Sequence, residues 1–477
     1  MTQHPDAPRV VIIGGGLAGA LSAIKIIDAT RAPLALTLVE ERAELGRGIA
    51  YSTNDLDHIV NGPARIFALH LDAPDHFTQW LAADPTRRGW RPPAGTALGD
   101  SFPPRALYGD YVQDELARAL GDAGGRVTFT HVRDRAVDLV PTTDGFRVAL
   151  RSGATRDADR VVLATGLFTS DRAIAVDPRL RHGSRYVADL WYDASALDGA
   201  EADRNILLLG TSLTALDGLI SLEKRGYRGR YVAISRRGLL PQERREAAPW
   251  PDFLDPDALP DRVSELLFAV RRELKAIRAA GADWQRLPLA VKPVLNALWS
   301  TASDAERRRF ARHLRVYWDI TLHRAAPPTY GWLARARAEG RFANIKGRVI
   351  ALDADGDTVA VTLRRRGASD TETLHVDRVV NGLGHEFDWR RIDDPLVRAL
   401  LARQLVAPHA TGYGIGADPA SGAVLDRAGR PSTRLFAVGH PLRGASWESS
   451  AIPEQLAQAT ALGATFAGLL AQRRDVA

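Results

Sequence analysis

Apolar runs of strand length and segments of helical spacing follow one another in a regular order at the start of the chain. Val10–Ile13 is an unbroken apolar run, Gly14–Gly16 interrupts it, and Leu17–Asp28 places apolar residues three and four positions apart. Leu36–Val39 is a second apolar run and ends at Glu40. This order predicts strand, glycine turn, helix and strand, which is how a Rossmann-like unit begins.

A second copy of this order lies in the middle of the chain. Ile206–Leu209 is apolar, Gly210–Ser212 supplies the turn, Leu213–Lys224 has helical spacing, and Tyr231–Ile234 is the next predicted strand. Each copy is followed by a predicted β-meander whose return strand runs into a glycine. The meander strands are Val127–His131, Arg135–Val140, Phe146–Leu150 and Arg160–Ala164 after the first copy, and Arg348–Leu352, Val359–Leu363 and Arg378–Val380 after the second. The predicted fold class is α/β, with two dinucleotide-binding (Rossmann-like) domains and β-meander inserts.

Residues 241–339 lack strand patterns and form a predicted helical insertion. Apolar residues from Val263 to Ile277 recur at helical spacing, and a capping box of Ser303 and Glu306 opens a further helix. We expect this further helix to pack its large side chains inward. They are Phe310, Leu314, Tyr317 and Trp318.

The length of 477 residues predicts two or three domains at ~150 residues per domain. We assign residues 1–166 and 340–477 to a discontinuous first domain and residues 167–240 to a second domain. The insertion, residues 241–339, is expected to line the substrate site or an interface.

Composition excludes several kinds of chemistry. The absence of cysteine excludes disulfides, thiolate metal sites, iron–sulfur clusters and a redox-active dithiol. The net charge is +6, but the longest basic runs, Arg307–Arg309 and Arg364–Arg366, span only three residues, so we predict no nucleic-acid partner. No apolar stretch reaches the ~18 residues of a membrane span. Because Val10–Ile27 contains the glycine turn, we interpret it as part of the fold rather than as a secretory signal, and expect a cytoplasmic protein.

The glycines of the first turn form a dinucleotide-binding motif. Gly14 permits the tight turn, Gly16 lets a pyrophosphate approach the backbone, and Gly19 lets the helix pack closely on the strand. Glu40, at the end of the second strand, suits ribose hydroxyls and would repel a 2′-phosphate. The motif therefore favours FAD or NAD over NADP.

The second turn repeats this motif in relaxed form. Gly210, Ser212 and Ala215 keep small residues at the three positions. Arg236 and Arg237 follow the next strand in place of an acid, where two guanidiniums either clamp a 2′-phosphate or face solvent or a carboxylate. We predict an NAD(P)H site here, with the choice between NADH and NADPH open.

A third strand–glycine–helix arrangement lies near the end of the chain. Leu435–Val438 runs into Gly439, and a helix is predicted from Pro453 to Leu470, so its N-terminus would lie near a flavin ring. In the intervening loop, function and simple packing are both open for His440, Arg443, Trp447 and Glu448. No metal site is predicted, because ligand spacing is lacking around His58, His313 and His323.

Several stretches of the chain resemble one flavoprotein group. They are Gly46–Tyr51, His58–Ala64, Phe77–Leu81, Phe102–Gly109, Ala164–Gly166, Gly210–Asp217, Ser235–Leu240 and Trp447–Pro453. The group is the FAD/NAD(P)-binding flavoprotein monooxygenase family that includes FAD-dependent urate hydroxylase and aspartate N-monooxygenase. The resemblance spans nearly the whole chain and implies FAD at Gly14, Gly16, Gly19 and Glu40, with Arg47, Asn61 and Arg105 near the cofactor. Gly166 and Gly439, which end predicted strands, are further candidates for cofactor binding. Where many such flavoproteins have Gly-Asp near the C-terminal strand, this chain has Gly439-His440.

The resemblance implies an oxidoreductase, a monooxygenase that uses NAD(P)H and O₂ on a small-molecule substrate. Asn61 is the candidate beside the reactive edge of the flavin, and Arg443 or Arg105 would hold an anionic substrate. We expect urate hydroxylation to 5-hydroxyisourate, a step of purine metabolism. The alternatives are an amino-acid N-hydroxylase acting on a substrate such as aspartate, a flavin reductase that passes electrons to a protein partner, and a non-catalytic flavin-binding sensor or assembly factor. The oligomeric state stays open.

Overall fold

A six-stranded sheet forms the centre of the first domain in the computed structural model, which describes residues 7–169, 174–191 and 194–472. The strand order is β18-β19-β7-β1-β2-β3, and every neighbouring pair is parallel except β18 with β19. The strands are β1 (Arg9–Ile13), β2 (Leu34–Val39), β3 (Val127–Val132), β7 (Arg160–Leu163), β18 (Ala423–Leu425) and β19 (Pro431–Ala437). Helix α1 (Leu17–Ala29) connects β1 to β2, which confirms the first predicted Rossmann-like start.

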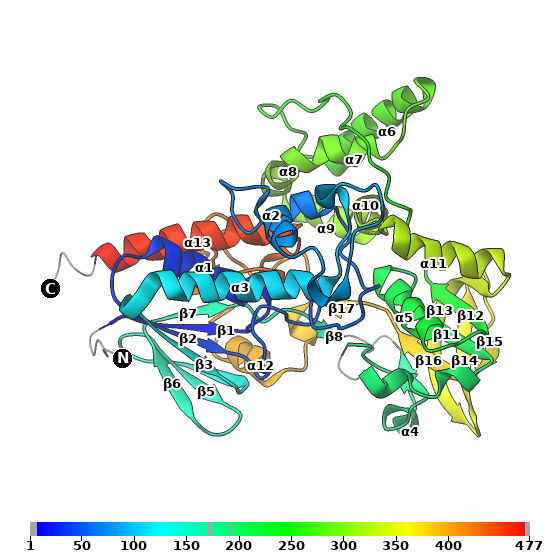
Figure 1. Cartoon of the computed structure of the whole chain (residues 1–477), viewed down its shortest axis with the longest axis horizontal. Helices are drawn as coiled ribbons and strands as arrows, with labels where there is room; N and C mark the ends of the chain where they lie inside the picture. The colour runs from blue at the N-terminus through cyan, green and yellow to red at the C-terminus, as the bar shows by residue number, and fades with distance from the viewer. Residues whose placement is uncertain (1–6, 170–173, 192–193, 473–477) are drawn as a thin grey trace.

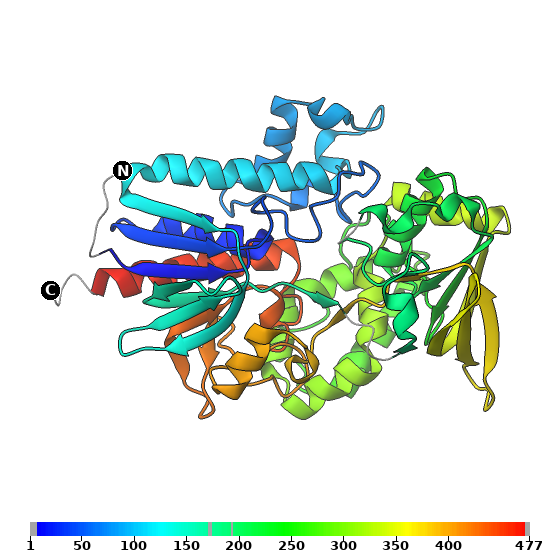
Figure 2. The same cartoon turned by 90° about the horizontal axis from the view of Figure 1, so that it is seen from below.

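Different layers cover the two faces of this sheet (Figures 1 and 2). Helix α1 lies between α3 (Arg105–Ala123) and α13 (Ile452–Gln472) on one face. The other face packs on a small antiparallel sheet and on α12 (Pro395–Ala402). The small sheet consists of β4 (Ala136–Pro141), β5 (Phe146–Leu150) and β6 (Thr155–Ala158).

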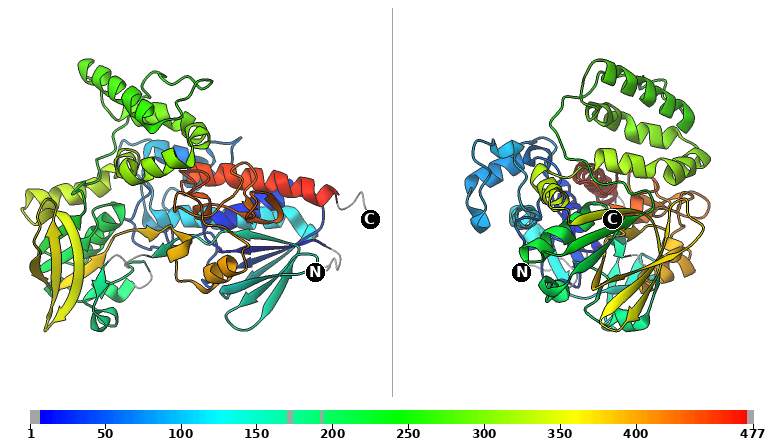
Figure 3. Two further views of the ribbon diagram at one scale, coloured as in Figure 1. Left: turned by 180° about the vertical axis from the view of Figure 1, so that it is seen from behind. Right: turned by 90° about the vertical axis from the view of Figure 1, so that its right-hand side faces the viewer.

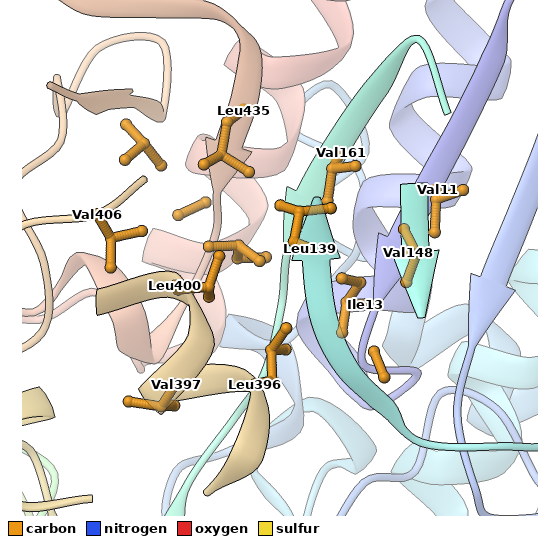
Figure 4. Close-up of a cluster of buried hydrophobic side chains, with 14 of the residues drawn as sticks. Val11, Ile13, Leu139, Val148, Val161, Leu396, Val397, Leu400, Val406 and Leu435 are labelled. Atoms are coloured by element: carbon orange, nitrogen blue, oxygen red, sulfur yellow. The ribbon is translucent and has the colours of Figure 1, made fainter. Parts of the chain in front are cut away.

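Figure 4 shows the core on this second face. Val11 and Ile13 point from β1 toward Leu139 and Val148 of the small sheet, and Leu400 of α12 closes the cluster. Full burial of an aliphatic side chain contributes about 1.5–3 kcal/mol. The packing therefore holds the carboxyl end of β1, where the glycine turn begins, in a fixed place.

A second sheet forms the second domain. Its order is β10-β16-β11-β12-β13-β14-β15, with β9 beside β13. The strands are β9 (Ala175–Val176), β10 (Tyr186–Val187), β11 (Asn205–Leu209), β12 (Arg230–Ser235), β13 (Phe342–Asp355), β14 (Thr358–Arg365), β15 (Glu372–Val376) and β16 (Arg378–Asn381). Helix α5 (Leu213–Lys224) joins β11 to β12, as predicted, and the short α4 (Pro178–Arg181) precedes β10.

The boundary that we expected between the domains is corrected by this topology. We assigned residues 340–477 to the first domain, but β13 pairs in parallel with β12, and β16 pairs in parallel with β11. The start of β13 extends the parallel sheet, and its later half opens the meander with β14. The meander therefore stays with the dinucleotide unit that it follows, and residues 342–381 belong to the second domain.

Helices α6, α7 and α8 of the insertion project from one side of the molecule (Figures 1 and 3). The helices from the insertion onward are α6 (Val263–Ala279), α7 (Arg286–Val291), α8 (Leu295–Thr301), α9 (Asp304–His313), α10 (Arg315–Leu322) and α11 (Pro327–Ala338). Helix α11 packs on α5 and contributes Leu333 and Ala336 to the core of the second domain, although we assigned it to the insertion.

The helix predicted from Ser303 is broken. Ser303 caps α9 by accepting a hydrogen bond from the Glu306 amide, as predicted, but the helix is interrupted at Leu314, which separates α9 from α10. Tyr317 is 48% exposed, so our expectation that it packs inward is wrong.

Two chain segments connect the domains. They are β8 (Phe168–Thr169) and β17 (His385–Glu386), which pair with each other in antiparallel fashion. The remaining helix of the first domain, α2 (His76–Ala83), packs beside α3 through Phe77. Across the described ranges, no helix combines the length and the apolar character that a bilayer crossing requires.

Candidate functional site

A cavity of about 480 Å³ opens at the carboxyl end of β1. Its wall contains five of the residues that we predicted for cofactor binding: Gly14, Gly16, Glu40, Arg47 and Gly166. The wall also contains Gly48 and Tyr51 of one loop, and His440, which follows Gly439. Ligands of parallel α/β sheets bind at this end of the strands, where the helix N-terminus also points.

Glycine geometry makes this cavity possible. Gly14 has φ +102°, and a Cβ there would collide with the carbonyl oxygen of Ala164. A Cβ on Gly19 would collide with the carbonyl oxygen of Gly14, so Gly19 serves the close packing of α1 and does not line the cavity. A Cβ on Gly16 would lie 3.2 Å from the Cα of Gly48. Two facing glycines thus keep a cradle free of side chains, where a pyrophosphate can meet bare backbone.

Glu40 and Arg47 face the cavity and are also held in place by contacts within the protein. Glu40 accepts hydrogen bonds from the backbone N–H groups of Gly15 (2.8 Å) and Arg42 (3.0 Å). These bonds fix the carboxylate at the cavity wall, and its oxygens retain lone pairs for ribose hydroxyls. Arg47 is buried, forms an ion pair with Asp110 and donates to the carbonyl of Ala106 at 3.1 Å.

Asn61, Arg105 and Gly439 do not line this cavity, although we predicted all three at the cofactor. Arg105 instead donates to both carboxylate oxygens of Asp217, at 3.0 and 3.2 Å. The carbonyl of Asn61 accepts a hydrogen bond from Arg244 at 3.4 Å. Asn61 therefore lies beside the segment that leads into the insertion. A cofactor contact for these three residues remains a prediction.

The Arg105–Asp217 pair fastens α3 of the first domain to α5 of the second. Its side chains are 11% and 5% exposed. We expect Asp217→Asn to lower the free energy of unfolding by about 2 kcal/mol, because the change leaves a buried guanidinium without its counter-charge. Urea denaturation followed by tryptophan fluorescence measures the loss. Asp198→Asn, at an exposed pair with Arg225, is the matched control and should change stability by less than about 0.5 kcal/mol; equal effects of the two variants would contradict this role.

The second glycine turn repeats the geometry of the first. Gly210 has φ +94°, and its N–H donates to the carbonyl of Ile234 at 2.8 Å, as Gly14 donates to Val39 at 2.9 Å. A Cβ on Gly210 would lie 2.5 Å from the carbonyl oxygen of Gly382. Ser212 occupies the N-cap position of α5. Ala215 lies in its first turn, where its Cβ would be 3.4 Å from a Cβ on Gly382. These residues thus form the predicted turn, and their contact with a nicotinamide cofactor stays a prediction.

Arginines gather beside this second turn. Partial burial and the nearby charges of Arg315 and Arg237 lower the pKa of Arg236, and Arg348 adds to the effect. Within the described ranges, no carboxylate pairs with Arg236, Arg237 or Arg348. The sequence left open a carboxylate partner for Arg236 and Arg237, and the structure offers none there. Clustered guanidiniums without counter-charges are suited to a phosphate.

A partly buried polar cluster joins the C-terminal loop to the insertion. Arg443 is 7% exposed, and its Nη2 lies 3.8 Å from Oδ1 of Asp319 on α10. Neither Nε of Arg443 nor Oδ1 of Asp319 has a hydrogen-bond partner among the described residues. Burial raises the pKa of Asp319. Beside them, Glu448 accepts a hydrogen bond from the indole of Trp318 at 2.7 Å and lies 3.4 Å from His323.

Two histidines lie near Arg443, and one of them, His440, lines the cavity. Burial lowers the pKa of His440 to about 3, with a further effect of His385 and Arg443. Burial also lowers the pKa of His385 to about 4. Both imidazoles are therefore neutral near pH 7. The Arg443 guanidinium, which lies 4.7 Å from the ring centre of Phe387, is a cation of the loop that follows His440.

Comparison with known proteins agrees with this geometry. Residues 11–168 match the FAD-NAD(P)-binding family. The ornithine hydroxylase of Pseudomonas aeruginosa, in its reduced form, has the same fold over 97% of this chain and 100% of that chain, with a TM-score of 0.64 and 15% identity. Residues 11–168 therefore form an FAD-NAD(P)-binding domain, and the chain has the fold of a flavin monooxygenase. This confirms the family resemblance, the fold class and the cofactors that we expected.

Two further proteins are similar to this flavoprotein. The ornithine N-hydroxylase of Kutzneria sp. 744, solved with reduced FAD, NADP⁺ and L-ornithine, covers 98% of this chain and 100% of its own, with a TM-score of 0.61 and 16% identity. The L-aspartate N-monooxygenase (nitrosuccinate-forming) of Streptomyces davaonensis is 27% identical over 358 residues, which is 63% of this chain. The flavoprotein spans about half the length of that curated relative, 54%.

The residues that line the cavity suit the parts of FAD. The bare cradle of Gly16 and Gly48 suits a pyrophosphate, and Glu40 suits a ribose. His440 also lies in the wall and precedes the loop of Arg443 in the sequence, and we expect the redox-active ring at this part of the cavity. When bound, FAD supplies the transfer of electrons from NAD(P)H and the activation of O₂.

Sequence reasoning missed Asp319, His385 and Trp318 as site residues and treated His323 as isolated. Asp319 has one signal in the sequence, because it is an acid inside an otherwise apolar stretch, Val316–Leu322. His385 follows Gly384, the glycine after the return strand of the second meander. Gly166 has the equivalent position after the first meander. Neither signal says that the two residues face the loop of Arg443.

Proposed function

We propose that this flavoprotein is an NAD(P)H-dependent monooxygenase that hydroxylates the amino group of a small acidic amino acid. Likeness to hydroxylases of amino acids over nearly the whole chain supports the reaction type. The relative named L-aspartate N-monooxygenase supports an acidic substrate. The observation that carries the proposal is the pair of Arg443, which is buried, and Asp319, which is 28% exposed. Arg443 belongs to the loop that follows His440, a residue of the cavity wall, and Oδ1 of Asp319 and Nε of Arg443 have no hydrogen-bond partner among the described residues.

This proposal replaces the urate hydroxylation that we expected from the sequence. The comparisons give no support to urate or to purine metabolism, and they favour our alternative, amino-acid N-hydroxylation. A planar urate anion would engage Arg443 but would leave the Asp319 carboxylate buried against a second negative charge.

Each partner of the pair suits one group of an amino acid. Arg443 Nε and Nη2 can donate to a substrate carboxylate, and Asp319 Oδ1 can accept from the substrate ammonium. The nitrogen must lose its proton before it can be oxidised. Because burial raises the pKa of Asp319, its carboxylate is a better proton acceptor than an exposed one. Trp447 and Phe387 flank Arg443 and shield its guanidinium from water.

The test of this function is to follow NADPH and NADH oxidation, O₂ consumption and product mass with a panel of substrates. The panel contains L-aspartate, L-glutamate, L-ornithine, L-lysine and urate. We expect an acidic amino acid to accelerate NAD(P)H oxidation and to gain one oxygen atom on nitrogen. Acceleration by ornithine or lysine alone would contradict the assigned substrate charge. Electron transfer to a protein carrier without any hydroxylated product would favour the reductase alternative.

The arginines beside the second turn support NADPH as the co-substrate. Arg236 and Arg237 follow β12, the position that contacts the adenosine ribose in such domains, and no carboxylate neutralises them among the described residues. We expect Arg236→Ala to raise KM for NADPH about tenfold and to change KM for NADH little, because a charge-assisted phosphate bond is worth roughly 1.5–3 kcal/mol. Steady-state kinetics with both nucleotides measures this difference. Arg366→Ala, an exposed arginine on the far meander, is the control; an equal rise for NADH would contradict the assignment.

A further inference from the structure

We propose that His70, His76 and Glu115 form a binding site for a zinc-like divalent metal ion, away from the FAD cavity. His70 precedes α2, His76 is the first residue of α2, and Glu115 lies in the middle of α3. One ligand atom from each residue can be chosen so that all three lie within 4.8 Å of one another. The proposal is independent of the proposed function, and it revises our expectation that the chain has no metal site.

The separation between His76 and Glu115 suits a bound ion better than a direct hydrogen bond. Nε2 of His76 lies 3.9 Å from Oε1 of Glu115, which is too long for a hydrogen bond. Zinc forms bonds of about 2.0–2.2 Å to imidazole nitrogen and carboxylate oxygen, so an ion between the two atoms needs only a small closure of this gap. Nε2 of His70, at 2.7 Å from Oε2 of Glu115, is the third donor and reaches the ion by a small rotation of its ring.

The charges around the cluster allow a cation. Arg118 donates to Glu115 at 2.9 Å, through Oε2 and not through the Oε1 that faces His76. Arg118 also pairs with Asp28 and Asp122, so its positive charge is shared among three carboxylates. Two imidazoles and one carboxylate with an open fourth position form a donor set that selects zinc-type ions over magnesium or calcium.

The surroundings of His76 hold its ring for ligation. Nδ1 of His76 is hydrogen bonded to the hydroxyl of Tyr111 at 2.8 Å, and this hydroxyl also accepts from the Leu69 backbone N–H at 3.1 Å. Hydrogen bonding at the far ring nitrogen holds the orientation of the ring and leaves Nε2 available for a metal. The side chains of His70 and His76 are 19% and 30% exposed, so an ion and a water molecule can enter. An ion here would join the segment before α2 to α3.

The test is a titration of the FAD-loaded full chain, free of any affinity tag, with Zn²⁺ and Co²⁺. Isothermal titration calorimetry gives the stoichiometry, and the Co²⁺ absorption bands at wavelengths longer than those of the flavin report nitrogen ligands. We expect one Zn²⁺ per chain in the wild type, bound about 100-fold more weakly by His76→Gln and by Glu115→Gln. His375→Gln is the matched control, because His375 also lies beside a single carboxylate, that of Asp355, but on β15 of the second domain.

Hydrogen exchange of the wild type provides a reading that needs no variant. Zn²⁺ should slow exchange across residues 69–80 and leave β15 unchanged. Absence of saturable binding, or Zn²⁺ affinity that stays the same in His76→Gln, would overturn the proposal. Flavin absorbance shows that each variant is folded, so a variant that loses its flavin is replaced by His70→Gln, whose loss of Zn²⁺ affinity is expected to match.

Discussion

Gly16→Val should yield a folded but colourless protein. Gly16 has an ordinary backbone conformation, φ −69°, so a β-branched residue introduces no left-handed strain. Its side chain would, however, fill the cradle opposite Gly48, whose Cα would lie 3.2 Å from the new Cβ. We expect FAD affinity to fall about 100-fold or more, about 2.7 kcal/mol. The ratio of flavin to protein absorbance, and FAD titration of the apoprotein by fluorescence, measure the loss.

Gly121→Val is the matched control for this variant. Gly121 lies in α3 without a positive φ, and a Cβ added there would have no neighbouring atom within 4 Å, so the larger side chain finds open space. The control should keep its flavin. Full flavin content in Gly16→Val would show that the pyrophosphate does not pass between Gly16 and Gly48, and the assigned orientation of FAD in the cavity would be wrong.

Arg443→Ala should abolish hydroxylation while FAD and NADPH still bind. The guanidinium is buried, stacks between Phe387 and Trp447, and is the partner assigned to the substrate carboxylate. Truncating one member of a buried charge pair costs about 2–5 kcal/mol, so kcat/KM for the acidic amino acid should fall about 1,000-fold. Product formation by mass spectrometry, with NADPH oxidation in the absence of substrate as the internal reference, measures the effect.

Arg443→Lys and Arg430→Ala complete this experiment. Lysine keeps the charge but lacks the planar fork that binds a carboxylate through two bonds, so we expect an intermediate loss. Arg430 is an exposed arginine of the same C-terminal region, and its removal should leave kcat/KM unchanged. If Arg443→Ala hydroxylates the substrate at the wild-type rate, the carboxylate is bound elsewhere and the proposed substrate site is incorrect.

The parts of the site that sequence predicted are those fixed by neighbouring residues. Gly14 and Gly16 follow a buried strand and open a helix, and Glu40 ends the next strand, so local chain geometry places all three at one end of the sheet. The same holds for Gly210 and the turn before α5. For such strand–turn–helix elements, the periodicity of apolar residues and the positions of glycines are enough to predict the local structure.

The parts that sequence did not predict depend on contacts between distant segments. Arg105 matches the family motif at its own position, but its partner Asp217 lies on a helix of the other domain. Asp319 meets Arg443 only because the insertion folds back over the C-terminal loop. Helical spacing says which face of a helix is apolar, but it does not say which other segment a polar residue on that helix will meet. The second meander was misassigned for the same reason, since strand partners are not encoded within the strand.

The pairing of β8 with β17 has a consequence for exchanging domains between homologous proteins. Residues 168 and 386 lie opposite each other in this pairing, so the chain enters and leaves the second domain at adjacent positions. A module with adjoining ends can be exchanged for a homologous one, or spliced out, without stretching the host that surrounds it. The two paired connections also restrict rotation of the second domain relative to the first, because two adjacent segments hold a domain more firmly than a single one.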